Sequence, residues 1–423
     1  MAQVDIERIE RDITAVSRFG FNEADRGVYR QGFTPEDMAA RAWLREQFES
    51  LGMTHEMDGA GNVIGRYGPA DMPAVVIASH LDSVPASGMF DGVLGVIAGL
   101  EVVRTLKENG VEPAFPLEVI APSEEERRFG GMLGAQALSG HLTREWLDSA
   151  ADEHGLMLRD AMAAVGLDHL KALHAYRRPE TIRAFLELHV EQGPVLDTEK
   201  ITIGIVEGIS GVFKWKVRLI GKADHAGTAP MDMRADALMG MVDFAHEIPR
   251  IIDEEGTDKS RVTIGHVACK PGFPHTVPGE VDFTIVGRDL DHDKMKALAE
   301  ACERVLSAIA RKHKLHFEYE QMSWLEPAYC DRAIMDLIED QTRKLGYSYK
   351  IMPSGAGHDV QFFCEHTRAG LFFVPSVKGV SHAPDEWTHW SDIERGTQLL
   401  YECVTELACN EAALSDRSEV ERA

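Results

Sequence analysis

The apolar positions along the chain follow two spacings, one typical of helices and one typical of buried strands. Residues 4–18 and 35–52 carry apolar side chains at helical spacing, so two helices precede the first strands. Short continuous apolar runs, typical of strands covered on both faces, lie at 74–78, 115–121, 185–190 and 369–374. A helix is predicted between the first two of these strands. Strands that alternate with helices predict an α/β fold with a mostly parallel sheet.

The pattern changes in the middle of the chain. Residues 214–220 alternate between apolar and polar side chains like a half-exposed strand, and a strand–helix–strand–strand–helix order follows up to about residue 320. The glycine-rich stretch 203–212 before it suits a hinge or a crossing between domains. An inserted α+β module within one larger domain explains this order. The predicted domains are the first part of a catalytic domain at 1–210, the inserted module at 211–324 and the second part of the catalytic domain at 325–423.

Length, charge and cysteine usage narrow the class of protein. A chain of 423 residues exceeds what one core usually organises, which agrees with two domains. The formal net charge of −25 repels phosphate backbones, so nucleic acid is not an expected partner. The N-terminus lacks the apolar core of a signal peptide and no apolar run approaches about 20 residues, so we expect a cytoplasmic protein with no membrane contact. Six scattered cysteines indicate reduced thiols, against disulfides or a thiolate metal site as the alternatives.

Metal-capable side chains follow the end of each predicted strand. They are His80 and Asp91, then Glu124 and Glu125, then His189, then His382. Imidazole and carboxylate suit zinc, manganese or cobalt, and a carboxylate shared by two ions would place paired metals within about 4 Å of each other. Asp82 is placed to accept the other ring N–H of His80. Taken alone, each segment could be a polar turn or a solvated acidic run, but four such strand ends together favour a metal pair.

Eight segments in this order resemble the amidase/hydantoinase-carbamoylase family, which includes N-carbamoyl-L-amino-acid hydrolases, allantoate amidohydrolase and β-ureidopropionase. The segments are G-V-Y-R-Q-G-F-T at 27–34, S-H-L-D-S-V-P at 79–85, F-D-G-V-L-G-V at 90–96, E-E-E-R-R-F at 124–129, H-V-E-Q-G-P-V-L at 189–196, H-A-G-T-A-P-M at 225–231, S-G-A-G-H-D at 354–359 and G-V-S-H-A-P-D-E at 379–386. The family belongs to the larger group of dinuclear-metal aminoacylases and peptidases.

The resemblance implies two divalent metal ions, Zn²⁺ or else Mn²⁺ or Co²⁺, in each subunit. One ion would be held by His80, Asp91 and His189, and the other by Asp91, Glu125 and His382. Glu124 would act as the general base that takes a proton from the water between the metals and passes it to the leaving nitrogen.

The resemblance also implies a homodimer in which the inserted module is a dimerisation or lid domain. His225 would reach the partner subunit's active site and stabilise the oxyanion there. Gln192 and His358 would contact the ureido or amide group, and Arg288 would pair with the substrate carboxylate. Read alone, His225 could be a polar loop histidine, His358 a helix cap and Arg288 a surface strand arginine.

Two departures from the family pattern lie where substrate recognition is expected. Glu126 and Arg127 stand where relatives often have a small pair, and His275 stands at the place of an asparagine. From the family resemblance we expect hydrolysis of a C–N bond in an N-carbamoyl-L-amino acid or related ureido acid, with allantoate as the nearest alternative substrate. A dipeptidase or aminoacylase is more distant, and a non-catalytic binding protein on the same scaffold is the alternative from another class.

Overall fold

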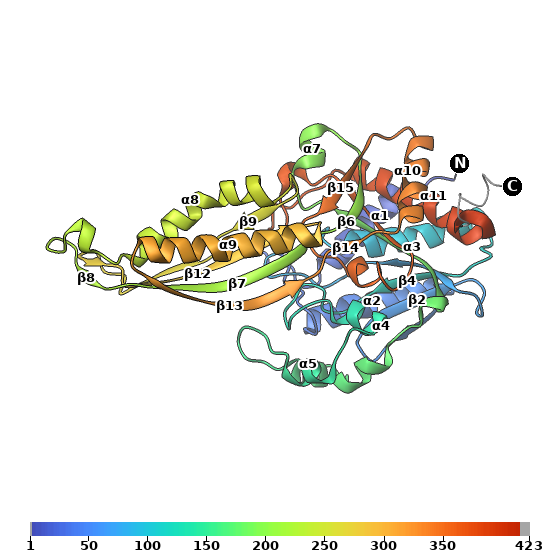
Figure 1. Cartoon of the computed structure of the whole chain (residues 1–423). Helices are drawn as coiled ribbons and strands as arrows, with labels where there is room; N and C mark the ends of the chain where they lie inside the picture. The colour runs from blue at the N-terminus through green and yellow to red at the C-terminus, as the bar shows by residue number, and fades with distance from the viewer. Residues whose placement is uncertain (1, 415–423) are drawn as a thin grey trace. The chain divides into compact units, whose positions relative to one another are not determined.

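The computed structural model describes residues 2–414, which form two compact units (Figure 1). Unit 1 comprises the described parts of Met1–Glu207 and Tyr329–Ala423, and unit 2 comprises Gly208–Ala328. The inserted module predicted at 211–324 falls inside unit 2. The charged C-terminal tail, residues 415–423, lies outside the described residues.

Unit 1 is built on a nine-stranded mixed sheet. In spatial order the strands are β1 (Thr54–Met57), β2 (Val63–Tyr67), β4 (Leu117–Ala121), β3 (Ala74–Ala78), β5 (Ile182–Val190), β16 (Ala369–Val374), β6 (Ile203–Ile209) and β14 (Ala328–Tyr329), with β15 (Tyr349–Ser354) beside β6. The central strands β4, β3, β5 and β16 are parallel, whereas β2 and β6 join them antiparallel. Every residue of β3, β4 and β16 is buried, as expected of parallel strands covered on both faces. The predicted fold class is confirmed.

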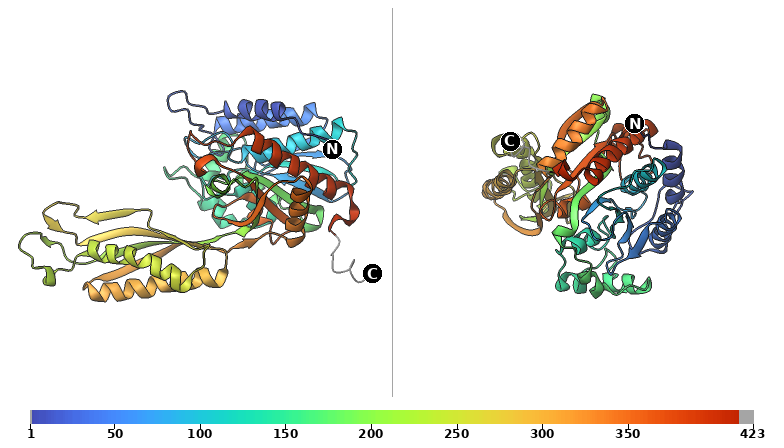
Figure 2. Two further views of the ribbon diagram at one scale, coloured as in Figure 1. Left: turned by 90° about the horizontal axis from the view of Figure 1, so that it is seen from above. Right: turned by 90° about the vertical axis from the view of Figure 1, so that its right-hand side faces the viewer.

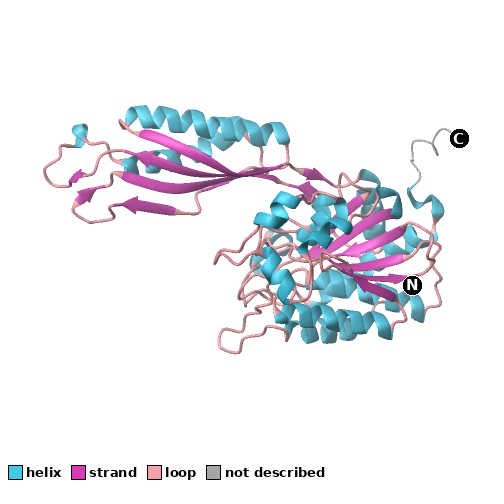
Figure 3. Cartoon of the chain, turned by 90° about the horizontal axis from the view of Figure 1, so that it is seen from below, coloured by secondary structure: helices cyan, strands magenta, loops and turns pink. Residues whose placement is uncertain are grey.

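Helices cover the sheet of unit 1 (Figures 2 and 3). The helices of unit 1 are α1 (Ile6–Ser17), α2 (Pro35–Ser50), α3 (Val93–Glu108), α4 (Leu133–Ser139), α5 (Arg144–Ser149), α6 (Leu158–Ala164), α7 (Val195–Glu199), α10 (Arg332–Lys344) and α11 (Trp390–Cys409), with short 3-10 helices at His169–His174, Pro179–Thr181, Asp359–Phe362, Val377–Gly379 and Glu411–Leu414. Helix α3 lies close to the strands because Gly95 has no side chain: a Cβ there would lie 2.6 Å from the carbonyl oxygen of Leu188. Thr34 caps α2 by accepting a hydrogen bond from the backbone N–H of Asp37, which is typical of a threonine before a helix.

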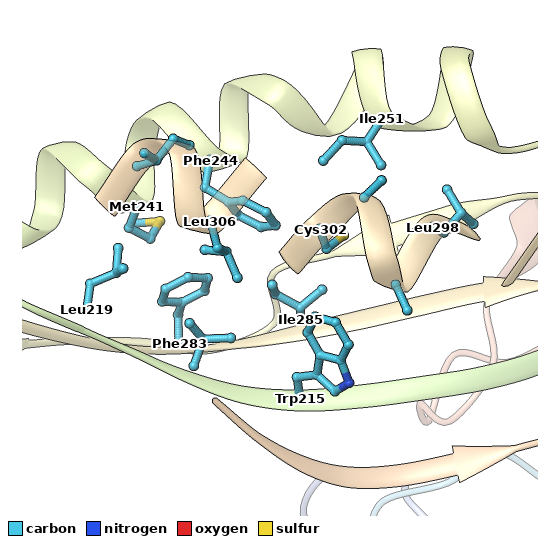
Figure 4. Close-up of a cluster of buried hydrophobic side chains, with 14 of the residues drawn as sticks. Trp215, Leu219, Met241, Phe244, Ile251, Phe283, Ile285, Leu298, Cys302 and Leu306 are labelled. Atoms are coloured by element: carbon cyan, nitrogen blue, oxygen red, sulfur yellow. The ribbon is translucent and has the colours of Figure 1, made fainter. Parts of the chain in front are cut away.

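Unit 2 has an antiparallel five-stranded sheet with two long helices packed against it. The strands are β10 (Val267–Lys270), β12 (Glu280–Asp289), β7 (Gly211–Ile220) and β13 (His316–Leu325), with β9 (Arg261–Thr263) beside β12, and the helices are α8 (Ala237–Glu255) and α9 (His292–Lys312). Alternate side chains of β7 and β12, such as Trp215 and Phe283, meet Phe244 of α8 and Leu306 of α9 in one core (Figure 4). The short 3-10 helix Met231–Met233 and a small sheet of β8 (Asp224–His225) with β11 (Thr276–Val277) complete the unit.

The carboxyl ends of the parallel strands position the candidate chemistry. Because β3, β4, β5 and β16 run in the same direction, the segments that follow them emerge at one edge of the sheet. These segments carry the histidines and carboxylates singled out from the sequence. Among residues 2–414, none of the helices has a stretch both long and apolar enough to span a bilayer.

Candidate metal centre

His80 lies just beyond β3 and His189 lies at the end of β5, and both present the same ring nitrogen to a shared space. Nδ1 of His80 lies 2.9 Å from the backbone oxygen of Asp82, and Nδ1 of His189 lies 2.8 Å from the backbone oxygen of Val190. A carbonyl oxygen only accepts, so each Nδ1 carries the proton and each Nε2 is unprotonated; the Nε2 of His189 accepts a hydrogen bond from the backbone N–H of Gly92 at 3.2 Å. For His80 the acceptor is the backbone carbonyl of Asp82, whereas we expected its carboxylate.

Asp91 lies among three histidines. Its Oδ1 is 3.1 Å from Nε2 of His189 and 3.8 Å from Nε2 of His80, and its Oδ2 is 3.0 Å from Nε2 of His382. The next residue, Gly92, has a φ of 68°, and a Cβ there would lie 2.5 Å from the His80 ring. A residue with a side chain at position 92 would therefore displace the His80 ring from Asp91.

Glu386 holds the Asp91 loop against the loop that carries His382. Its Oε1 accepts hydrogen bonds from the backbone N–H groups of Phe90 and Asp91 at 2.9 and 3.2 Å, and its Oε2 accepts from the Ser381 hydroxyl at 3.1 Å. The sequence analysis missed this role, although Glu386 ends the last of the eight segments. Its place four residues beyond His382 was the only signal that could have found it.

The first glutamate of the acidic run serves the local turn. Glu124 is fully buried, and its carboxylate accepts hydrogen bonds from the backbone N–H groups of Phe129 at 2.6 Å and Gly131 at 3.2 Å. Its φ of 57° turns the chain directly after β4. Burial raises the pKa of this carboxyl to about 8. Both oxygens are thus engaged in closing the turn 124–131.

The next two glutamates are the ones that approach the histidines. Oε2 of Glu125 lies 3.9 Å from Nε2 of His80, and Oε1 of Glu126 lies 3.6 Å from Nε2 of His382. Glu126 also joins Asp91 and His382 in a group whose potential ligand atoms all lie within 4.8 Å of one another. The carboxylate beside His382 is therefore Glu126, whereas the resemblance implied Glu125 there.

The unpaired atoms of this cluster fit bound cations. Oδ1 of Asp91 and Oε1 of Glu126 are buried and have no hydrogen-bond partner among the described residues. Burial and the neighbouring carboxylates raise the pKa of Glu125 and Glu126 well above the ordinary range. Buried oxygens that face histidine lone pairs lack a donor, and a divalent ion would supply the missing positive charge. The donor set, nitrogen and oxygen without thiolate, suits zinc, manganese or cobalt.

Gln192 and His358 lie at the same cluster. Nε2 of Gln192 is 3.0 Å from Oδ2 of Asp91 and 3.2 Å from Nε2 of His382, and its φ is 56°. His358 is buried, and its ring packs edge-on against His189 with the ring centroids 4.6 Å apart. Burial lowers the pKa of His358 well below its ordinary value, which keeps this imidazole neutral.

The remaining predicted site residues belong to unit 2. His225 on β8 is exposed, and its Nδ1 accepts hydrogen bonds from the backbone N–H groups of Gly227 and Thr228 at 3.0 and 3.2 Å. Its proton is therefore on Nε2, which can donate to an anionic oxygen. His275 lies beside it, because its carbonyl oxygen accepts a hydrogen bond from Ala226 N–H at 3.0 Å. Arg288 lies on β12.

Comparison with known proteins places the chain in a family. The profile of peptidase family M20/M25/M40 matches residues 76–406. An N-carbamoyl-L-amino-acid amidohydrolase of Paenarthrobacter aurescens is 37% identical over 95% of this chain and 97% of its own, and an allantoate amidohydrolase of Escherichia coli K12 is 30% identical over 95% and 98%. The crystal structure of a hydantoinase/carbamoylase family amidase from Burkholderia multivorans superimposes with a TM-score of 0.90 at 31% identity, covering 97% of this chain and 99% of that one. These findings confirm the resemblance drawn from the eight segments, and the chain belongs to peptidase family M20/M25/M40.

Proposed function

We propose that this protein hydrolyses the C–N bond of an N-carbamoyl-L-amino acid or a related ureido acid, releasing ammonia, carbon dioxide and the amino compound. The observation that carries this proposal is the meeting of three histidine Nε2 atoms around one buried carboxylate, Asp91, in a chain similar to N-carbamoyl-L-amino-acid amidohydrolases. Two bound divalent ions would polarise the scissile carbonyl and make a water nucleophilic near neutral pH.

We assign the ligands from the distances. His80, Asp91 and His189 would hold one ion, and Asp91, Glu126 and His382 the other. Asp91 offers one oxygen to each side, which suits the shared position. This assignment moves the carboxylate of the second ion one residue along the chain from the one that the resemblance implied.

Glu125 then takes the role of general base. Its carboxylate faces His80 from the acidic run, whereas both oxygens of Glu124 accept hydrogen bonds from the backbone of the turn. A base must reach the proton that it abstracts, and the two N–H groups hold the Glu124 carboxylate in the turn, so we assign the base to its neighbour. Glu125 would take a proton from the attacking water and deliver it to the leaving nitrogen.

The dimensions of unit 2 support a homodimer in which two subunits complete one site. Arg288 lies eight residues beyond Glu280 on β12, which is about 26 Å at about 3.3 Å per residue. His225 lies beyond the other end of that strand, where it pairs with Thr276. One small substrate cannot contact both side chains of one chain, so we infer that His225 acts on the substrate of the partner subunit while Arg288 pairs with its carboxylate.

The test is ammonia release from a panel of N-carbamoyl-L-amino acids, allantoate and dipeptides by metal-stripped enzyme reloaded with zinc, manganese or cobalt. Turnover of N-carbamoyl-L-amino acids supports the proposal, turnover of allantoate alone favours the second candidate substrate, and turnover of dipeptides alone makes the enzyme a peptidase. No turnover of any of them refutes hydrolysis. The six free cysteines suit a reducing compartment, and we place the enzyme in the cytoplasm.

A further inference from the structure

The side chain of Arg127 lies beside the metal-ligand cluster of unit 1. It follows Glu126 directly, and its φ of 61° is a left-handed conformation that is rare outside glycine. A Cβ at Gly357 would lie 2.6 Å from Nη2 of Arg127. Gly357 thus leaves the space that the guanidinium occupies, and it does so immediately before His358.

The charge of Arg127 reaches the groups that the proposed reaction uses. His358, the residue after Gly357, contacts the ring of His189, one of the proposed ligands. Burial raises the pKa of Glu125, and the guanidinium of Arg127 acts in the opposite direction on the same carboxyl. Burial lowers the pKa of His358, and Arg127 adds to that effect. The guanidinium therefore lies at the rim of the cluster and not on a remote surface.

Arg127 has its donors free. The side chain is exposed and makes no hydrogen bond or ion pair with any of residues 2–414, although a guanidinium has five N–H donors. The neighbouring Arg128 differs, because it donates to the carbonyl oxygen of Gly32 at 2.9 Å and lies 3.4 Å from Oδ2 of Asp152. Arg128 holds the loop, whereas the exposed Arg127 has no hydrogen-bond or ion-pair partner among residues 2–414.

We propose that Arg127 binds a second carboxylate of the substrate, so that the preferred N-carbamoyl-L-amino acids have an acidic side chain. The inference rests on the proposed function, in which Arg288 pairs with the α-carboxylate. A guanidinium donates two parallel hydrogen bonds to a carboxylate, which gives both affinity and orientation. The two metal ions would offset the negative charge of Asp91 and Glu126. An anionic substrate side chain beside the cluster would then pair with the Arg127 guanidinium.

The test is calorimetric titration of metal-loaded enzyme that carries Glu125→Gln, which blocks turnover. The ligands are N-carbamoyl-L-aspartate and its neutral isostere N-carbamoyl-L-asparagine. We expect tighter binding of the aspartate compound, and Arg127→Gln should weaken that binding about ten- to hundredfold while changing the asparagine compound less than about twofold. Arg127→Lys keeps the positive charge but cannot donate two parallel hydrogen bonds, so it should retain part of the preference for the aspartate compound.

A matched control removes the same charge elsewhere. Arg144→Gln alters an exposed arginine on α5 whose ion-pair partner among the described residues is Asp148, and it should leave both affinities unchanged. Equal affinity for the two ligands, equal loss for both in Arg127→Gln, or binding of neither ligand would overturn the proposal.

Ammonia release by the unmutated enzyme separates the two proposals. Turnover of N-carbamoyl-L-amino acids without preference for acidic side chains refutes the role of Arg127 and leaves the hydrolase. Binding that depends on Arg127 without turnover of any compound refutes the hydrolase and leaves the anion site.

Discussion

Glu124→Gln tests whether the structure or the family motif identifies the base. The Glu124 carboxylate accepts two backbone hydrogen bonds in a fully buried turn. Glutamine keeps one oxygen and replaces the other with an NH₂ group, so one buried N–H loses its acceptor. Such a loss costs about 1–3 kcal/mol. We expect thermal unfolding several degrees lower, two ions still bound, and turnover reduced less than about tenfold, because the group that moves the proton remains.

Glu125→Gln and Glu126→Gln are the matched variants in the same run. Glu125→Gln should keep both ions in elemental analysis and lose about a hundredfold or more in ammonia release, because the base is gone. Glu126→Gln should lose one ion, since a neutral amide is a poor replacement for a carboxylate ligand. If Glu124→Gln instead loses a hundredfold in turnover while its melting temperature and metal content stay unchanged, the assignment from the geometry is wrong and Glu124 is the base.

Three further predictions concern the ions, the dimer and the pH dependence of stability. Asp91→Ala should cost both ions in elemental analysis, whereas His80→Ala should weaken chiefly one; loss of one ion in both variants would contradict a shared carboxylate. An equal mixture of His225→Ala and Arg288→Ala chains, each inactive alone, should recover about a quarter of the activity through heterodimers with one intact site. If the subunits have exchanged and no activity returns, His225 and Arg288 of the same chain act in the same site. Burial raises the pKa of Asp58 to about 6, so the protonated carboxyl is favoured in the folded state. Its contribution to the free energy of unfolding is full below pH 4 and falls by up to about 3 kcal/mol as the pH rises to and past 6. In Asp58→Asn, the free energy of unfolding from denaturant titrations should not show this decrease between pH 4 and 6. The same decrease in the variant would show that Asp58 is not its cause.

The sequence was sufficient for the architecture because the architecture depends on local patterns. Continuous apolar runs predicted β3, β4, β5 and β16, and the helical spacing of residues 35–52 predicted α2. The change to alternating residues after Phe213 predicted a separate α+β module. Such periodicities report which faces are buried, and burial largely decides the fold class.

The sequence also singled out most of the candidate ligands. His189 lies at the end of β5, and His80, Asp91 and His382 lie in the segments that follow β3 and β16; strands of a parallel sheet bring their carboxyl ends to one edge. Their convergence follows from that topology without knowledge of any distance. The family resemblance added the order of the segments and the kind of chemistry.

The tertiary structure alone decided where each carboxylate of the acidic run lies. From the sequence, any of the three adjacent glutamates could approach the histidines. Only the turn after β4 shows that Glu124 folds back onto Phe129 and Gly131 while Glu126 approaches His382. A difference of one residue rotates a side chain to another direction, and sequence spacing carries no information about that rotation.

The same limit applies to contacts between distant segments. The hydrogen bonds of Glu386 to the Asp91 loop join residues almost 300 positions apart, and the space that Gly357 leaves for Arg127 depends on two loops that meet only in the folded chain. The sequence by itself determined the layers, the inserted module and the strand ends that carry the chemistry, because these follow from local periodicity. The tertiary structure decided which glutamate approaches which histidine and where the Arg127 guanidinium lies, because both depend on where the loops after different strands come to lie.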